Sequence, residues 1–215
     1  MIKAIIFDMD GVIADSEFCH IDAEIRTMKI FGIDIKKEEL EGYTGTTSKY
    51  MYEHLKAKHD FQISFEKFFE VKRQFLFENF EKFLHPVDGV INLIKNLHKK
   101  EFKLALASSS HRNAIDYILK KFEIYEFFDA ITSFEEIKNS KPDPEIFLKS
   151  AEKLKFLPTE CVVIEDAKLG IKGAKRAGMK CIGFQNPNGN QDLSRADLVV
   201  RRFEVGEVLG FLEKL

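Results

Sequence analysis

The chain has 215 residues, of which 45% are hydrophobic and 32% are charged. This composition is typical of a folded globular protein and excludes a largely disordered or fibrous chain. The 33 Lys and Arg residues and the 35 Asp and Glu residues are interspersed and leave a net charge of −2. Nucleic acid and anionic membrane surfaces are therefore not expected as partners, because the chain offers them little electrostatic attraction.

No segment has the uncharged length of a membrane span, and the first apolar stretch ends at Asp8. We therefore expect a cytoplasmic protein, and we expect it to be a monomer or a weak dimer. The three cysteines, Cys19, Cys161 and Cys181, are odd in number and include no Cys-x-x-Cys pair. They are predicted to be reduced residues of the core.

The apolar segment at 2–7 has the β-branched and aromatic character of a strand. From residue 102 onward, further strand-like segments alternate with amphipathic helical patterns. The predicted strands are 103–107, 128–132, 161–164, 180–184 and 198–200, and the predicted helices are 112–122, 145–154, 169–177 and 204–215. This alternation predicts an α/β protein with a doubly wound, Rossmann-like core, in which helices cover both faces of a parallel sheet.

About ninety residues of almost purely helical pattern separate the first strand from the second, although a crossover needs only about a dozen. We predict an all-helical cap domain at residues 15–83, inserted into a core formed by residues 1–14 and 84–215. Both linkers of this cap leave the same strand end, so the cap is placed to close over it as a lid. One cap helix has Ser64 as its expected N-cap and an apolar stripe of Phe65, Phe68, Phe69, Leu76, Phe80 and Phe83.

Polar side chains follow four of the predicted strands. Asp8 and Asp10 are two positions apart, so they project in the same direction from the end of the first strand. Three serines at 108–110 follow the second strand, Lys141 lies after the third, and Glu165-Asp166 follows the fourth. Ligands of open α/β sheets bind at the carboxyl ends of the strands, so these groups are expected to converge there.

The converging groups suit a phosphoryl group beside a hard cation. Oxygen ligands are preferred by Mg²⁺, and lysine and hydroxyl donors bind phosphate oxygens. One carboxylate can be the nucleophile that forms an aspartyl-phosphate, and a second can protonate the leaving oxygen and then activate water. The metal would reduce the repulsion between the nucleophile and the phosphate.

Each segment alone has a simpler interpretation. An Asp-x-Asp-Gly sequence is often a turn or the start of a calcium loop, although Val12 stands where such a loop needs its next ligand. The serines could cap the following helix, Lys141 could be a solvated lysine, and Glu165-Asp166 could be a capping pair. The occurrence of all four at four strand ends favours a catalytic site.

Four motifs of the chain resemble those of the haloacid dehalogenase-like hydrolase superfamily and occur in the same order. They are Phe7-Asp8-Met9-Asp10-Gly11-Val12-Ile13 with Asp15-Ser16, Ala107-Ser108-Ser109, Ser140-Lys141-Pro142-Asp143 and Ile164-Glu165-Asp166. The resemblance covers the whole chain, including a helical cap in the first inserted position. By pattern the chain is similar to the β-phosphoglucomutase-like sugar-phosphate enzymes of this superfamily.

The resemblance implies a role for each motif residue. Asp8 would be the nucleophile and a ligand of Mg²⁺. Asp10 would be the general acid/base and would give its backbone carbonyl to the metal. Asp166 would be a further metal ligand, and Glu165 beside it would be another ligand or a carboxylate that supports the ligands. The groups expected to bind the transferring phosphoryl group are the Ser108 side chain, the Ser109 backbone and Lys141.

Other classes of protein remain as alternatives. A signalling receiver domain also places a phosphorylatable Asp, an acidic pair, a hydroxyl and a Lys at strand ends. That family has its phospho-acceptor on a later strand and no helical insert, whereas here Asp8 and Asp10 come first. A catalytically inactive relative is disfavoured because no motif residue is missing. Dehalogenating and phosphonate-cleaving relatives lack the second Asp, so phosphate-ester chemistry is favoured.

Residues of the cap distinguish a phosphatase from a mutase. Mutases of this family have a Gly-Val-Ser-Arg string in the cap, whose arginine binds the non-transferring phosphate. Here the string is Gly45-Thr46-Thr47-Ser48-Lys49, and an ammonium lacks the bidentate fork of a guanidinium. His20 is kept at the mutase-like distance from the first motif. The candidate substrate contacts in the cap are His20, Thr47, Ser48 and Lys49.

A second basic position of the cap is displaced, with Lys72 and Arg73 nearby and Gln74 at the aligned position. We therefore expect a Mg²⁺-dependent phosphatase of small phosphorylated metabolites, with sugar phosphates as the expected substrates. The alternative is a β-phosphoglucomutase that interconverts β-glucose 1-phosphate and glucose 6-phosphate.

Overall fold

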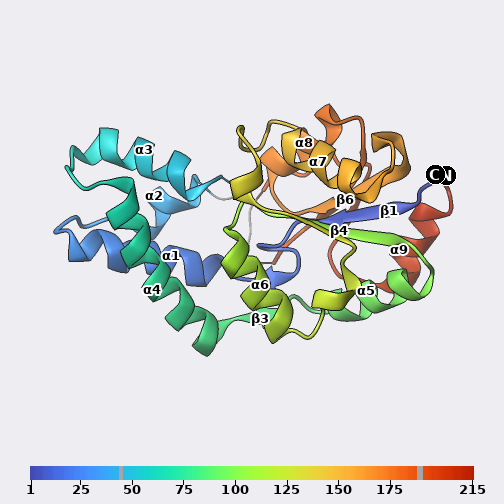
Figure 1. The fold of residues 1–215 in the computed structure, drawn as a ribbon, viewed down its shortest axis with the longest axis horizontal. Helices are drawn as coiled ribbons and strands as arrows, with labels where there is room; N and C mark the ends of the chain where they lie inside the picture. The colour runs from blue at the N-terminus through green and yellow to red at the C-terminus, as the bar shows by residue number, and fades with distance from the viewer. Residues whose placement is uncertain (44–45, 188–190) are drawn as a thin grey trace.

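The computed structural model describes residues 1–43, 46–187 and 191–215. Within these ranges, six strands form one parallel sheet (Figure 1). In spatial order they are β5 (Ala130–Thr132), β4 (Lys103–Ala107), β1 (Ala4–Phe7), β6 (Cys161–Glu165), β7 (Lys180–Phe184) and β8 (Leu198–Val200). Because β1 lies between β4 and β6, the residues that follow it stand near the middle of the carboxyl edge of the sheet.

Helices cover both faces of this sheet. Alternate residues of β1 point to opposite faces, so Ile5 and Phe7 belong to one apolar cluster whereas Ala4 and Ile6 belong to another. All four residues are fully buried, as expected for a strand with covered faces. The first cluster includes α5 (Val90–Lys99), α6 (Arg112–Lys121) and α9 (Val205–Leu212), and the second includes α7 (Glu145–Leu154) and α8 (Lys168–Arg176).

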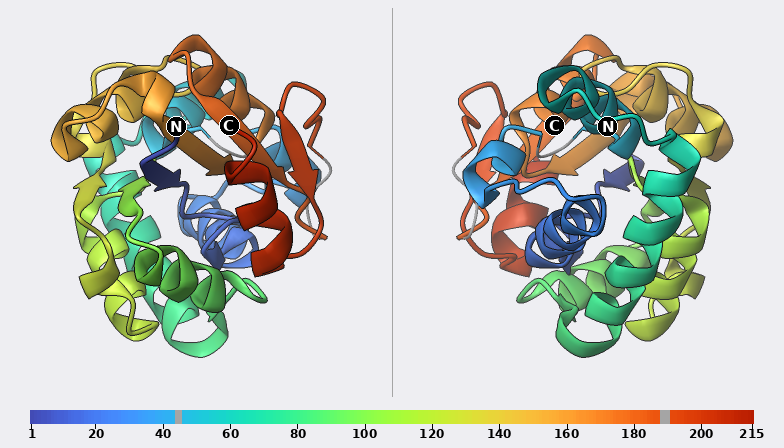
Figure 2. Two further views of the ribbon diagram at one scale, coloured as in Figure 1. Left: turned by 90° about the vertical axis from the view of Figure 1, so that its right-hand side faces the viewer. Right: turned by 90° about the vertical axis from the view of Figure 1, so that its left-hand side faces the viewer.

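A group of helices between β1 and β4 lies beside the sheet, and the right-hand view of Figure 2 shows it in front of the sheet. Part of this group has its own apolar cluster, which includes Met28, Leu55 and Phe68. Another part, with Cys19 and Phe80, shares the apolar cluster of the sheet. The group is therefore joined to the core at its base. Its helices are α1 (Glu17–Ile30), α2 (Lys37–Glu41), α3 (Ser48–His59) and α4 (Phe65–Phe83). We refer to them as the cap.

The two linkers of the cap are paired with each other. β2 (Ala14–Asp15) and β3 (His85–Pro86) form a short antiparallel ladder, with Ala14 opposite Pro86 and Asp15 opposite His85. The N–H of Val87 extends the ladder by donating to the carbonyl of Ile13 at 3.0 Å. The ladder holds both linkers side by side shortly after β1, so the cap is attached at the edge where β1 ends.

The predicted α/β class and the doubly wound parallel sheet are confirmed, with small differences at the ends of elements. The first strand begins at Ala4 rather than at residue 2. The strand predicted at 128–132 begins at Ala130, and Phe128 is instead the C-cap of the 3-10 helix η1 (Tyr125–Phe127). Two further 3-10 helices are η2 (Phe134–Glu136) and η3 (Pro158–Glu160).

The apolar stripe of α4 is buried only in part. Phe68, Leu76 and Phe80 are buried, whereas Phe83 at the end of the helix is 51% exposed. All three cysteines lie in the described part of the chain, are buried and form no disulfide. No helix within the described ranges is long and apolar enough to cross a lipid bilayer.

Candidate active site

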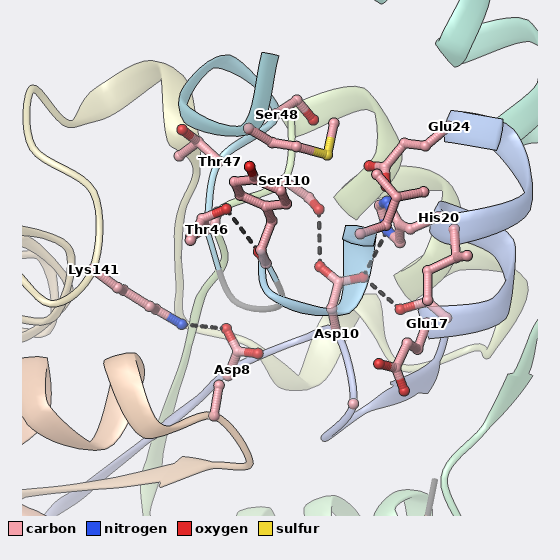
Figure 3. A pocket seen from close by; sticks show the side chains of 18 of the residues that line it. Asp8, Asp10, Glu17, His20, Glu24, Thr46, Thr47, Ser48, Ser110 and Lys141 are labelled. Atoms are coloured by element: carbon pink, nitrogen blue, oxygen red, sulfur yellow. Dashed lines mark hydrogen bonds and ion pairs between the residues drawn. The ribbon is translucent and has the colours of Figure 1, made fainter. Parts of the chain in front are cut away.

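Asp8 follows β1 directly and lies at the centre of a cluster of charged groups. Lys141, from the loop between β5 and α7, donates from Nζ to Oδ1 of Asp8 and to Oε1 of Glu165, each at 2.6 Å. Glu165 is the last residue of β6. The three side chains are buried. Two carboxylates that stand at strand ends thus meet the ammonium group of a distant loop, and Figure 3 shows Lys141 pointing at Asp8.

Burial dominates the electrostatics of this cluster. It raises the pKa of the Asp8 carboxyl to about 7, against the effect of Lys141 and with the support of Glu165. Burial also raises the pKa of Asp166 well above its usual range, and the charges of Glu165 and Asp8 add to the shift. Burial acts to lower the pKa of Lys141, but the two carboxylates outweigh it and raise that pKa. Lys141 is therefore cationic, and its single positive charge is accompanied by the three carboxyl groups of Asp8, Glu165 and Asp166.

The carboxyls are arranged as a cation site. One oxygen from each of Asp8, Glu165 and Asp166 lies within 4.8 Å of the others. All three donors are carboxylate oxygens, which suit Mg²⁺ better than softer metals. A divalent cation would also relieve the repulsion that raises the pKa values of Asp8 and Asp166. The residues therefore fit the metal that the sequence predicts.

Glu165 differs from the other two carboxyls because both of its oxygens accept hydrogen bonds. Besides the bond from Lys141, Oε2 accepts from the backbone N–H of Ala167 at 2.7 Å. A Cβ atom on Gly170 in α8 would lie 1.6 Å from Glu165 Oε1. Only glycine at this position leaves room for the carboxylate, so α8 is shaped around Glu165.

Asp10 is held by donors from the cap and from the core. Ser16 Oγ donates to Oδ1 at 2.6 Å, His20 Nε2 lies 3.1 Å from the same oxygen, and Ser110 Oγ donates to Oδ2 at 2.9 Å. Burial acts to raise the pKa of Asp10, but His20 and the two hydroxyls outweigh it and hold the pKa well below its usual range. In this arrangement Asp10 is a carboxylate.

The serines after β4 differ in position, because Ser109 and Ser110 line the cavity whereas Ser108 is absent from its described lining. Ser108 is fully buried, and its Oγ accepts from the N–H of Ser110 at 3.0 Å, which fixes the turn. Ser109 lines the cavity beside Asp8. Its Oγ is buried and has no hydrogen-bond partner among the described residues. A buried hydroxyl of this kind calls for a partner that the protein does not supply, and a phosphate oxygen fits it.

The wall of the cavity opposite Asp8 belongs to the cap (Figure 3). Lys72 of α4 donates from Nζ to Glu24 Oε1 at 2.5 Å and to Ser48 Oγ at 2.9 Å. Thr47 is buried and lies against the core, where Ser140 Oγ is 3.4 Å from its Oγ1. His20, Thr47 and Ser48, three of the cap candidates from the sequence, line the cavity.

Lys49 is exposed and is absent from the described lining of the cavity. Thr47 is the N-cap of α3 and accepts from the N–H of Tyr50, and the turn that follows carries Lys49 to the outside. Gly45, the first residue of the same string, lies outside the described residues. Lys72 is the cap lysine that faces the cavity instead, whereas Arg73 and Gln74 are exposed.

The cap also touches the core at a second point. Phe69 of α4 packs on the ring of His111, with 4.2 Å between the ring centroids. On the core side, His111 Nδ1 lies 2.9 Å from Glu135 Oε1. Together with the contact of Thr47 and Ser140, this shows that the cap is in contact with the core near the cavity.

A family model described as haloacid dehalogenase-like hydrolase matches residues 5–184. The match includes the whole of the charged cluster and the cap. The chain belongs to this family. It is 30% identical over 184 residues to the phosphorylated carbohydrates phosphatase of Thermotoga maritima, covering 84% of this chain and 83% of that protein. It is 34% identical over 210 residues to the beta-phosphoglucomutase of Bacillus subtilis, covering 93% and 89%.

The likeness extends to solved structures. The crystal structure of the beta-phosphoglucomutase from Clostridium difficile matches this haloacid dehalogenase-like chain with a TM-score of 0.87 at 30% identity, covering all of this chain and 96% of the other. The chain is therefore an enzyme of the group that contains phosphatases and phosphomutases. A receiver-like, non-enzymatic function is set aside by this membership.

Three residues that the structure places at the site of this haloacid dehalogenase-like enzyme have no role assigned from the sequence. Ser110 and Ser16 bind Asp10, and both stand in or next to the quoted motifs. Glu24 lines the cavity one helical turn after His20. The spacing of four residues in a helix, which places both side chains on one face, is the signal that identifies Glu24.

Proposed function

We propose that this haloacid dehalogenase-like enzyme is a Mg²⁺-dependent phosphatase that hydrolyses small phosphorylated metabolites, with sugar phosphates as the substrate class. The observation that carries the proposal is that Asp8, held by Lys141, and Asp10 line one cavity with a polar cap wall. The name of the Thermotoga maritima relative, a phosphatase of phosphorylated carbohydrates, supports the substrate class.

In the first step, an oxygen of Asp8 attacks the phosphorus atom, and the bond between phosphorus and the ester oxygen breaks. Asp10 in its protonated form gives its proton to the leaving oxygen, so the sugar departs as an alcohol. Lys141 fixes Oδ1 of Asp8 at 2.6 Å, which leaves Oδ2 as the attacking atom. Lys141, Ser108 and Ser109 would stabilise the charge on the phosphoryl oxygens.

In the second step, water attacks the phosphorus atom of the aspartyl-phosphate, and the bond to the Asp8 oxygen breaks. Asp10 takes a proton from the water and inorganic phosphate leaves. The hydrogen bonds from Ser16 and Ser110 and the contact with His20 favour the carboxylate form of Asp10, which is the form that this step requires. The proton that Asp10 gains is the one that it gives in the next turnover.

Asp8 and Asp166 would hold the metal, with Glu165 orienting Lys141 beside them. The Asp10 carbonyl is the further ligand that the family resemblance implies. When bound, Mg²⁺ supplies positive charge that lets an anionic nucleophile approach an anionic phosphate.

A β-phosphoglucomutase is the second candidate, favoured by the similarity to two proteins of that name. A mutase must bind a second phosphate in the cap, because the sugar has to reverse its orientation between the two phosphoryl transfers. Lys49 is exposed, and Lys72 is already paired with Glu24. The cap therefore favours hydrolysis over transfer.

A panel of phosphate esters assayed with Mg²⁺ for phosphate release tests the proposal. We expect release that a chelator abolishes. A coupled assay for glucose 6-phosphate formed from β-glucose 1-phosphate, with a trace of the bisphosphate, tests the second candidate. Glucose 6-phosphate formed without phosphate release would replace the phosphatase by a mutase, and turnover insensitive to chelator would contradict the metal requirement.

A further inference from the structure

The cap wall of the cavity contains a buried ion pair that the proposed reaction does not use. Lys72 of α4 and Glu24 of α1 are joined at 2.5 Å, and their side chains are 3% and 9% exposed. Ser48 shares the ammonium group at 2.9 Å. Both charged residues line the same cavity as Asp8, and Figure 3 shows Glu24 above His20 on that wall.

The stability of the cap does not explain this pair. Removing two charges from water costs about as much as their attraction returns, and apolar residues of similar size would stabilise a core at least as well. The cavity lining around the pair includes the apolar residues Ile21, Leu40 and Met51 and the polar residues His20 and Ser48. The cap wall thus combines apolar contacts with a few polar groups, as small-molecule sites do.

The charges of the pair cancel, and this limits what it can bind. A sugar hydroxyl could donate to Glu24 and accept from Lys72 while both charges stay paired. A second phosphate or a carboxylate would have to take Lys72 from Glu24, leaving a buried carboxylate beside another anion. The other lysine on the cavity, Lys141, is bound to Asp8 and Glu165, so it offers no replacement.

We propose that Glu24 and Lys72 recognise hydroxyl groups of the leaving group, and that the enzyme therefore selects monophosphates of neutral polyhydroxy compounds against substrates with a second anionic group. This inference rests on the proposed function, because it concerns the leaving group of the same hydrolysis. Glu24 and Lys72 act here as specificity residues and take no part in the bond changes at phosphorus.

The direct test compares glucose 6-phosphate with glucose 1,6-bisphosphate, which differ by one phosphate. We expect the wild-type enzyme to show a kcat/KM for phosphate release that is at least about tenfold higher for the monophosphate, as expected for a site that must break a buried pair to accept an anion. Equal values, or a preference for the bisphosphate, would overturn the inference.

Substitutions of Glu24 and Lys72 test whether the ion pair causes the preference for the monophosphate. Glu24→Gln leaves Lys72 cationic and unpaired, so the preference should shift toward the bisphosphate by about tenfold or more. The double variant Glu24→Gln/Lys72→Met removes the cation and should lose that shift. Glu70→Gln is the matched control, because Glu70 lies on the helix that carries Lys72 but is exposed, paired with Lys67 at 2.9 Å. An unchanged ratio in folded Glu24→Gln would contradict the proposal.

Thermal denaturation of each variant reports folding. If Glu24→Gln does not fold, the wild-type comparison and the double variant, which buries no unpaired charge, still decide the inference. Phosphate release from the other esters of the panel by the wild-type enzyme is measured alongside. Absence of release from every ester counts against the proposed function, whereas release with no discrimination against the bisphosphate counts against the role of Glu24 and Lys72 alone.

Discussion

Lys141 Nζ lies 2.6 Å from Asp8 Oδ1, although the two residues are 133 positions apart in the sequence. The sheet topology explains the contact, because all six strands of the sheet are parallel and the segments after β1 and β5 leave from the same edge of the sheet. The contact occupies one oxygen of Asp8 and aims the other into the cavity that the cap covers. Substitutions of Asp8 and Lys141 therefore have the most specific expected effects on this enzyme.

Asp8→Asn should abolish turnover. The amide cannot form an acyl-phosphate, so phosphate release should fall by at least about a thousandfold. The measurement is phosphate release from the best ester of the panel, together with intact mass after acid quenching, which should show a phosphorylated wild type and an unmodified variant. Asp116→Asn, which changes a partly exposed carboxylate paired with Arg112, is the control and should retain activity. Full activity of Asp8→Asn would exclude Asp8 as the nucleophile.

Lys141→Met should destabilise the enzyme in a way that Mg²⁺ partly reverses. The substitution leaves the buried carboxyls of Asp8 and Glu165 without their cation, and this should cost about 3 kcal/mol of unfolding free energy. Denaturant unfolding in chelator and in Mg²⁺ measures the difference, which should be smaller with the metal.

The control for this prediction is Lys103→Met. Lys103 forms an exposed ion pair with Asp129 at 2.6 Å, so its loss should cost under about 1 kcal/mol and should not respond to Mg²⁺. If Mg²⁺ stabilised both variants equally, the carboxyl cluster would not be the metal site.

The core half of the site could be predicted from the sequence because strand ends carry its side chains. Asp8, Ser108 and Glu165 each stand at or beside the end of a short apolar run, and a parallel sheet brings such ends to one edge. Their convergence follows from topology and needs no knowledge of side-chain packing. Lys141 lies farther from a strand, and its motif rather than its position identified it.

The cap half could not be predicted in the same way, because a helix turns neighbouring residues to different sides. Ser48 faces the cavity and Lys49 faces solvent, and the difference depends on where α3 begins. Lys72 is buried although Arg73 beside it is exposed. That burial depends on how α4 packs against α1, where Glu24 supplies the opposite charge.

Gly170→Ala should disturb Glu165 without changing any charged group. The added Cβ would lie 1.6 Å from Glu165 Oε1, so the carboxylate must move off Lys141. We expect a loss of about 1–3 kcal/mol in unfolding free energy and a lower kcat. Gly210→Ala in α9 is a matched control, because a Cβ there meets no atom within 4 Å. It should be neutral or stabilise by about 0.5–1 kcal/mol. Equal stability of the two variants would show that α8 shifts freely.

The pH dependence of stability should include a contribution from Asp197. Burial acts to raise its pKa, but hydrogen bonds from Lys175, Lys180 and the N–H of Cys181 outweigh it, so the pKa lies below the ordinary value of 3.8. A carboxyl with a depressed folded pKa stabilises the protein above its unfolded pKa and loses that contribution as the pH falls through the folded value. The contribution is therefore fully present above about pH 4 and disappears below it.

Asp197→Asn should consequently lower the unfolding free energy by about 1–2 kcal/mol at pH 7, and the difference from wild type should shrink as the pH falls below 3.8. Denaturant unfolding at neutral pH and at several acidic values measures this difference directly, so the acid sensitivity of other carboxyls cancels. Asp88→Asn, at an exposed position, is the control and should change stability little at any pH. A difference for Asp197→Asn that stays constant down to the lowest pH would mean that the loss at pH 7 comes from side-chain packing rather than from the charge of Asp197.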